Sequence, residues 1–114
     1  MSTYLVTVER AQRMGSVLQV LPRIRLGELV AREPGIMMPM PGDGLWLRFP
    51  DGSSRTAVVG LFGIDAWQTP DGSLLTDSDP RDPVVTLSIA GDLQPADVPA
   101  GTQVWLTDPL YAPS

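Results

Sequence analysis

The sequence predicts a small all-β domain, folded as a closed or partly open antiparallel barrel of six to seven strands. Short segments in which apolar and polar residues alternate recur along the chain, as they do in half-buried strands. Asp-Gly and Gly-Asp pairs separate these segments and are typical of tight turns. The chain has 11 Gly and 12 Pro among 114 residues, which leaves little room for long helices. We expect one barrel domain over residues 1–108 and a C-terminal tail over residues 109–114.

The first two strands are expected in the N-terminal part of the chain. Alternation over residues 3–9 predicts a strand that carries three apolar side chains on one face, namely Tyr4, Val6 and Val8. The same pattern over residues 16–21 predicts the second strand. Pro22 follows it and is expected at a strand end or an edge, because proline donates no ladder hydrogen bond.

The next part of the chain is less regular. Residues 24–27 predict a short third strand that ends at a glycine. Residues 28–33 have acceptable helical spacing, but Pro34-Gly35 follows, so we expect an irregular segment or a single helical turn. Residues 36–41 are apolar and contain two prolines, which indicates an extended segment that covers one end of the barrel.

The strongest local signal is a hairpin over residues 41–65, with its turn at Pro50-Asp51-Gly52-Ser53. Its first strand alternates, so that Leu45, Leu47 and Phe49 are expected on the inner face. Gly60 and Gly63 interrupt the second strand and predict a bulge, a bend or a close backbone approach.

The C-terminal part predicts three further features. A second Pro-Asp-Gly turn joins residues 65–68 to residues 73–76 as a hairpin. A polar loop follows over residues 76–83. Alternation over residues 84–90 and again over residues 102–107 predicts the last two strands, before a frayed tail.

Charge and composition narrow the classes of function. The formal net charge is −5, and the basic residues are eight Arg with no Lys, so nucleic acid is not expected as the main partner. Cys is absent, which excludes disulfides and thiolate chemistry and fits a reducing compartment. The first residues lack the features of a signal peptide, and no apolar run is long enough to span a membrane, so we expect a cytoplasmic protein. The Arg-rich, Lys-free composition is typical of a GC-rich bacterial genome.

Several short motifs, taken in order, form a pattern that covers about residues 7–106. They are Gly15-Ser16-Val17, Arg23-Ile24-Arg25-Leu26-Gly27, Gly42-Asp43, Gly60-Leu61-Phe62-Gly63-Ile64 and Asp97-Val98-Pro99-Ala100-Gly101. This order resembles the second, β-barrel domain of translational GTPases of the elongation factor Tu type. The resemblance implies a barrel of that kind and a role in contact with the ribosome or a structured RNA. Pro22 and Arg81-Asp82-Pro83 depart from the family pattern, and no Gly-rich loop ending in Lys is present to bind nucleotide phosphates.

The candidate contact residues are aromatic, basic and sulfur-containing. Trp46 and Trp105 are out of phase with the inward residues of their strands, so they either form an exposed interface or each packs beneath a loop or against its neighbour across strands. Arg48 shares a face with Trp46 and adds hydrogen-bond donors to such a patch. The methionines Met37, Met38 and Met40 have three interpretations: packing in the core or a loop, a partner surface, or a soft-metal site.

The acidic residues suggest two kinds of site, each with a simpler alternative. Asp77, Asp79 and Asp82 are either a solvated loop or oxygen ligands for a cation, although the EF-hand spacing is missing. A second group lies at turns and strand ends, where the residues either cap the backbone or pair as acid and base: Asp43, Asp65, Asp92 and Asp97. Ser53 and Ser54 have no His or Lys as a base, because the chain contains neither.

The sequence therefore favours a non-catalytic binding or accessory module that contacts another protein or a second copy of itself, with no cofactor, no metal and no membrane contact. A translation-associated module that touches the ribosome or structured RNA is the first alternative. A small carboxylate-dependent hydrolase is the second alternative, and it requires two coupled carboxylates in one pocket.

Overall fold

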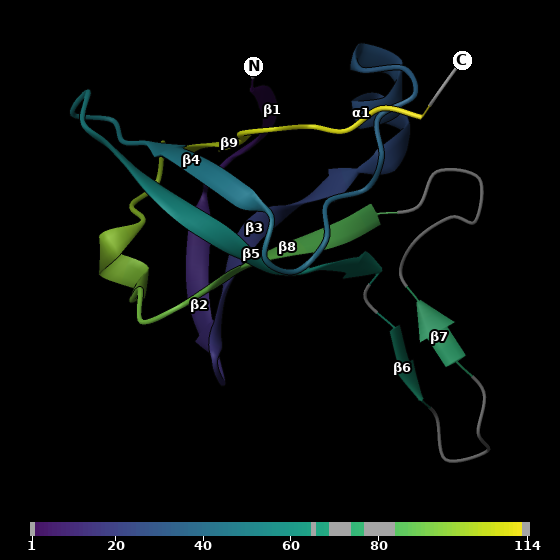
Figure 1. Ribbon diagram of the computed structural model, residues 1–114. Helices are drawn as coiled ribbons and strands as arrows, with labels where there is room; N and C mark the ends of the chain where they lie inside the picture. The colour runs from purple at the N-terminus through teal and green to yellow at the C-terminus, as the bar shows by residue number, and fades with distance from the viewer. Residues whose placement is uncertain (1, 65, 69–73, 77–83, 113–114) are drawn as a thin grey trace.

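Seven antiparallel strands form one curled sheet, a half-barrel, in the computed structural model (Figure 1). The structure describes residues 2–64, 66–68, 74–76 and 84–112. The order of strands across the sheet is β1-β9-β4-β5-β8-β3-β2. These strands are β1 (Thr3–Thr7), β2 (Arg10–Met14), β3 (Val17–Arg25), β4 (Gly44–Arg48), β5 (Ser54–Ile64), β8 (Val84–Ala90) and β9 (Gln103–Leu106). The prediction of an all-β antiparallel fold is confirmed.

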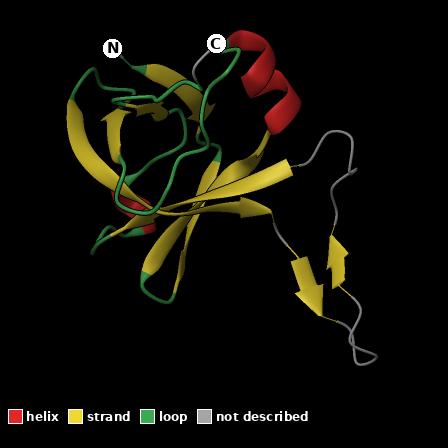
Figure 2. Cartoon of the chain, turned by 45° about the vertical axis from the view of Figure 1, so that its right-hand side comes forward, coloured by secondary structure: helices red, strands yellow, loops and turns green. Residues whose placement is uncertain are grey.

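Three smaller elements accompany the curled sheet. Helix α1 (Leu26–Arg32) packs against β3, and a short 3₁₀ helix, η1 (Pro95–Asp97), precedes β9. The strands β6 (Ala66–Gln68) and β7 (Leu74–Thr76) pair as a separate hairpin, as predicted, and it projects away from the sheet (Figure 2). The loop predicted over residues 76–83 begins at Thr76, which belongs to β7. Residues 77–83 and the turn between the two strands lie outside the described residues.

The predicted central hairpin is confirmed in β4 and β5. Their register runs from Gly44 opposite Val58 to Arg48 opposite Ser54. Leu45 and Leu47 are fully buried, while Phe49 is half-buried beside the turn. The turn closes through the N–H of Phe49, which donates to the carbonyl of Ser53 at 2.8 Å. Gly52 has φ +91°, a conformation that favours glycine.

The two edge strands of the sheet, β1 and β2, follow each other in the sequence. The N–H of Val8 donates to the carbonyl of Thr102 at 2.8 Å, and the N–H of Glu9 donates to the carbonyl of Leu21 at 2.8 Å. Residues 8 and 9 thus connect one end of the strand order to the other. This connection curls the sheet around a core of buried aliphatic side chains, among them Leu18, Leu45, Leu47, Leu87, Ile89 and Val104.

Strand β2 is absent from the sequence-based expectation, which treats residues 10–15 as a connection. Its residues are Arg, Ala, Gln, Arg and Met, so no apolar alternation marks it. It pairs with β3 through a turn in which Gly15 has φ +63°. Pairing with β3 therefore makes residues 10–14 a strand, although their side-chain pattern does not predict one.

The prediction that Tyr4, Val6 and Val8 lie on one face of β1 is wrong for Tyr4. The register with β9 shifts between Tyr4 and Val6, as at a β-bulge. Leu5, Val6 and Val8 are all buried as a result, while Tyr4 is only half-buried. A bulge changes the face on which the following side chains lie, and the sequence pattern does not contain it.

The predicted third strand over residues 24–27 is also wrong. β3 continues through Pro22 to Arg25, and α1 begins at Leu26. Pro22 lies just past Leu21, the last residue of β3 that pairs with β2, and within the stretch where the register with β8 shifts. Pro22 thus lies within β3, which is neither a strand end nor an edge strand of the sheet, but its missing N–H falls where regular pairing has ended.

Residues 26–32 form a seven-residue helix, where the sequence predicts at most one turn. Leu29 is its one buried side chain, with 0% exposure. Packing of this leucine into the core stabilises a helix too short to persist alone.

The bulge predicted for β5 is confirmed at Gly60 and not at Gly63. The register with β8 shifts between Val59 and Leu61. A Cβ on Gly60 would lie 2.8 Å from Cγ1 of Val17 and 3.0 Å from the backbone N of Ala90, so only glycine permits this close approach. A Cβ on Gly63 would meet no atom within 4 Å.

Backbone hydrogen bonds hold residues 110–112 against residues 35–37, so the expectation of a frayed tail is wrong for these three residues. Met37 N–H donates to the carbonyl of Leu110, and Ala112 N–H donates to the carbonyl of Gly35, both at 2.7 Å. Tyr111 forms a β-bridge with Ile36. The chain after β9 therefore lies along residues 35–37.

Candidate functional site

Three aromatic residues lie side by side across neighbouring strands. Trp105 in β9 is opposite Tyr4 in β1 on one side and opposite Trp46 in β4 on the other. Their neighbours Leu45, Leu47, Val104 and Leu106 are buried in the core. Because side chains alternate between the faces of a strand, Trp46 and Trp105 lie on the outer face of the sheet. We refer to Tyr4, Trp105 and Trp46 as the aromatic row.

Two arginines flank the aromatic row. The rings of Tyr4 and Trp105 meet edge to face, with their centroids 5.6 Å apart and an interplanar angle of 69°. The guanidinium carbon of Arg32 lies 5.2 Å from the Tyr4 ring centroid. That of Arg48 lies 5.9 Å from the Trp105 ring centroid. Each arginine therefore makes a cation–π contact.

The aromatic row combines an exposed end with a more buried part. Trp46 is 38% exposed, while Trp105 and Tyr4 are half-buried. The indole N–H of Trp105 donates to Oε1 of Gln103 at 3.4 Å, and the Tyr4 hydroxyl bonds Oγ1 of Thr7. The sequence left open whether the tryptophans are exposed or packed across strands. The structure combines the two, because Trp46 and Trp105 lie opposite each other on paired strands and both keep some exposure. Rigid, partly exposed aromatic side chains are suited to contact with a protein.

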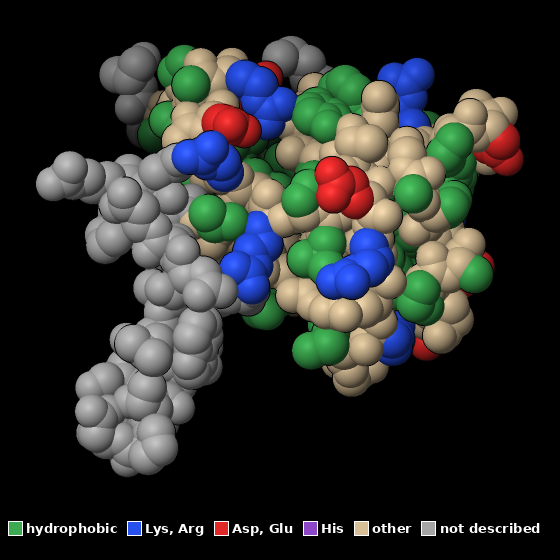
Figure 3. Space-filling view, turned by 180° about the vertical axis from the view of Figure 1, so that it is seen from behind, with side chains coloured by type: hydrophobic (Ala, Val, Ile, Leu, Met, Phe, Trp, Pro, Cys, Tyr) green, Lys and Arg blue, Asp and Glu red, His purple; other side chains and the backbone are tan. Residues whose placement is uncertain are grey.

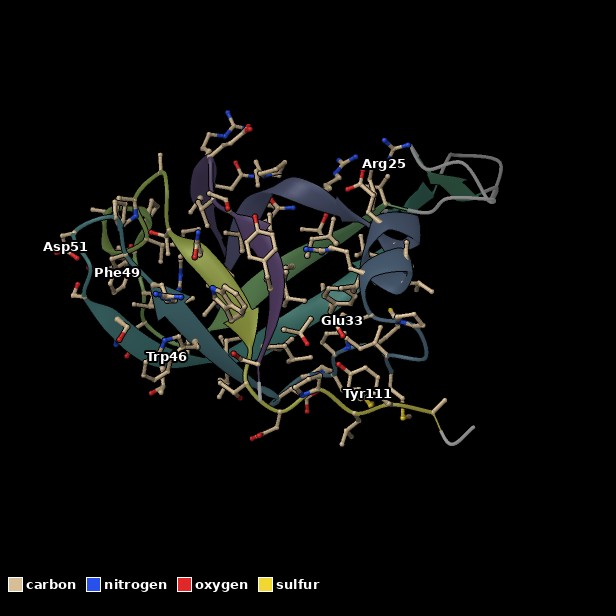
Figure 4. The ribbon with its side chains drawn as sticks, turned by 90° about the horizontal axis from the view of Figure 1, so that it is seen from above. Arg25, Glu33, Trp46, Phe49, Asp51 and Tyr111 are labelled. Carbon is tan, nitrogen blue, oxygen red and sulfur yellow. The ribbon has the colours of Figure 1, made fainter. Side chains whose placement is uncertain are left out.

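The three candidate methionines are exposed. Met37, Met38 and Met40 have exposures of 51%, 38% and 65%. Residues 36–41 were expected to cover one end of the barrel. Within this segment the buried residues are Ile36 and Pro39, and the methionines point to solvent instead. Exposed Leu110 and Tyr111 lie next to the methionines, because residues 110–112 run along residues 35–37. Figure 4 places Tyr111 beside Glu33, to which its hydroxyl donates at 2.8 Å, and away from Trp46.

A groove begins at the Tyr4 end of the aromatic row. We call it the β1–β3 groove. It has a volume of about 570 Å³, and three segments line it: residues 4–7 of β1, residues 22–25 of β3, and Glu28, Ala31 and Arg32 of α1. Seen from above, Trp46 lies on β4 and Arg25 lies near α1, with β9 and β1 between them (Figure 4).

Turn capping accounts for two of the candidate carboxylates. Oδ2 of Asp43 accepts the N–H of Met40 at 2.9 Å, and Oδ2 of Asp97 accepts the N–H of Gln94 at 2.8 Å. Asp92 and Asp97 line one hollow with Arg55. Among the described residues, no group of three or more His, Cys, Asp or Glu is placed to hold a metal ion. Asp65, Asp77, Asp79 and Asp82 lie outside the described residues.

Asp51, in the turn between β4 and β5, has a shifted pKa. Both the hydroxyl and the backbone N–H of Ser53 donate to Oδ1 of Asp51. These two hydrogen bonds hold the pKa of Asp51 below its ordinary value of 3.8, because they favour the charged carboxylate. The effect is local to an exposed turn and stabilises the hairpin that carries Trp46.

Comparison with protein-family models, with curated proteins and with solved structures found no match to this chain. No helix within the described part of the chain has the length and apolar character needed to cross a membrane.

Two residues of this surface, Tyr4 and Arg32, were not among the candidates from the sequence. Tyr4 was expected on the same face as Val6 and Val8, and the register shift in β1 separates it from them. Arg32 lies in a helix that the sequence did not predict at this length. A pairing of the first strand with the last would have revealed the contact of Tyr4 with Trp105, but no local signal specifies that pairing.

Proposed function

We propose that this chain is a non-catalytic binding module, that its partner is another protein, and that the aromatic row is the contact surface. The observation that carries the proposal is the position of Trp46, which is 38% exposed next to Trp105 on the outer face of a rigid sheet. Binding energy in protein interfaces is concentrated in a few Trp, Tyr and Arg residues. The aromatic row supplies Trp and Tyr, and Arg48 and Arg32 flank it. The net charge of −5 favours a protein over nucleic acid as the main partner.

Capture experiments from the native host test this proposal with two variants and one control. Trp46→Ala and Trp105→Ala should reduce recovery of the partner by about tenfold, as for central interface residues. The control is Leu61→Ala, which removes another exposed apolar side chain, 55% exposed on β5. Equal recovery with Trp46→Ala and Leu61→Ala would contradict the proposal. Light scattering after size exclusion shows whether the partner is a second copy of the chain.

A second candidate is a translation-associated module that contacts the ribosome or a structured RNA. The resemblance of the sequence to the second domain of elongation factor Tu type GTPases supports it, and under this candidate the curled sheet is a barrel of that type. The specific observation in its favour is that residues 1–32 contain five of the eight Arg and only two of the thirteen acidic residues. Co-sedimentation with ribosomes at moderate salt distinguishes this candidate, and its absence would argue against an RNA-contacting role.

A further inference from the structure

The β1–β3 groove has an apolar floor and a basic rim. Leu5, Val6 and Ile24 line it and are almost completely buried, with exposures of 3%, 6% and 5%. The charged residues that line it are Arg23, Arg25, Arg32 and Glu28. Three of the four charged side chains that line the groove are therefore basic, in contrast to the net charge of −5 of the chain.

Basic side chains are also prominent on the face of the molecule that carries α1, as Figure 3 shows from behind. This agrees with the uneven distribution of charge along the sequence, since five Arg and two Glu lie in residues 1–32. An anionic partner is therefore attracted to this face rather than to the remainder of the surface.

One groove arginine, Arg32, is positioned to contact a carboxylate. Its guanidinium carbon lies 5.2 Å from the Tyr4 ring centroid, and in the described part of the chain the guanidinium has no hydrogen bond or ion pair. Its N–H donors therefore remain available, and a carboxylate can accept two of them. Arg25 already has partners, because it forms an ion pair with Glu28 at 3.9 Å and makes a further interaction.

The wall of the groove formed by β1 is an edge of the sheet. β1 pairs with β9 on one side, and no strand among the described residues pairs with it on the other side. β3 pairs with β2 only as far as Leu21, so residues 22–25, which line the groove, lie beyond that pairing. An edge strand next to a groove is a common place for an extended peptide to bind.

We propose that the β1–β3 groove binds an extended acidic segment of the protein partner. A carboxylate of this segment bonds Arg32, and its apolar side chains cover Leu5 and Ile24. This inference rests on the proposed function, because it assumes that the partner is a protein, and it adds the chemistry that the partner must carry. Tyr4 belongs to both the groove and the aromatic row, so a single partner can contact both surfaces.

The first test uses two fluorescein-labelled peptides, one of alternating Asp and Val and one in which Asn replaces every Asp. Fluorescence polarisation with the full chain should show binding of the Asp peptide and at least about tenfold weaker binding of the Asn peptide, because hydrogen bonds to charged groups are involved. Binding of the Asp peptide should weaken at about 0.5 M NaCl. Equal binding of the two peptides, or no binding of either, would overturn the proposal.

Single-residue variants test whether the Asp peptide binds in the β1–β3 groove. Arg32→Gln should weaken binding of the Asp peptide by about tenfold, and Arg32→Lys should recover part of the loss because it keeps the charge. Arg55→Gln is the matched control, since it removes the same charge from a different hollow and should change affinity by less than about twofold. Amide shifts in NMR spectra should change at residues 4–7 and 22–25. Equal losses with Arg32→Gln and Arg55→Gln, or shifts confined to other residues, would contradict a peptide site in the groove.

Two further outcomes separate this inference from its alternatives. A single-stranded oligothymidylate that binds more tightly than the Asp peptide, and loses affinity in Arg32→Gln, would indicate a nucleic-acid groove and overturn the inference. If Trp46→Ala abolishes partner capture while Arg32→Gln leaves it unchanged, the proposed function stands and the acidic-segment inference fails. If Arg32→Gln abolishes peptide binding while Trp46→Ala leaves capture unchanged, the groove inference stands and the aromatic row is not the contact surface.

Discussion

The β4–β5 hairpin and the β1–β3 groove differ in how far apart in the sequence their residues lie. The hairpin joins residues 44–48 to residues 54–64 through one tight turn, and its register follows from that turn. The groove is built from three separate segments, of which one contains a bulge and another is a short helix. Local chemistry therefore determines the hairpin, whereas the groove depends on how distant parts of the chain pack.

The largest expected effect is a loss of stability when a buried side chain of the β4–β5 hairpin is shortened. Leu47→Ala removes a side chain with 0% exposure and should lower the free energy of unfolding by about 3 kcal/mol, because it leaves a cavity. Urea denaturation measures this loss. Trp46→Ala, one residue earlier on the opposite face, is the control and should cost about 1 kcal/mol or less. If the two variants are equally destabilised, the assignment of inner and outer faces is wrong.

A smaller effect is expected at the groove. Leu29 is the one buried side chain of α1, so Leu29→Ala should lower the free energy of unfolding by about 2–3 kcal/mol. Because α1 forms one wall of the groove, this variant should also weaken binding of the Asp peptide. Val30→Ala changes a side chain that is 44% exposed and should cost less than about 0.5 kcal/mol. Stability loss without any change in peptide binding would show that α1 does not shape the site.

The smallest effect concerns the hairpin turn. Ser53→Ala removes a hydroxyl donor to Asp51 and should raise the pKa of this carboxyl toward its ordinary value, as followed by NMR titration. The folded-state pKa of Asp51 is lowered, so its contribution to stability is present above pH 3.8 and is lost as the pH falls through the lowered folded value. Ser54→Ala is the control and should leave the pKa of Asp51 unchanged. A similar rise in both variants would mean that Ser53 is not the cause.

The contrast between local chemistry and the packing of distant segments also explains which features could be predicted from the sequence. The outward positions of Trp46 and Trp105 follow from alternation within their own strands, and the bulge at Gly60 follows from the lack of a side chain there. Strand β2 has no apolar pattern, and α1 depends on the burial of Leu29 against residues outside the helix.

The contact between Tyr4 and Arg32 illustrates the limit of local patterns. It requires a bulge in β1, a helix of sufficient length, and the approach of the two elements in space. Each of these depends on tertiary packing, which overrides local propensity. The aromatic row was therefore partly visible in the sequence, and the groove was not.

The position of β9 has a consequence for how the chain is made. β9 lies between β1 and β4 and pairs with both, although it is the last strand of the sheet in the sequence. During synthesis from the N-terminus, both neighbours are complete before residues 103–106 emerge from the ribosome. Until then β1 and β4 each lack a partner on the side that β9 later occupies. From the completion of β4 until the synthesis of β9, the nascent chain consequently carries two open edges, a state in which contact with chaperones or with other nascent chains is favoured.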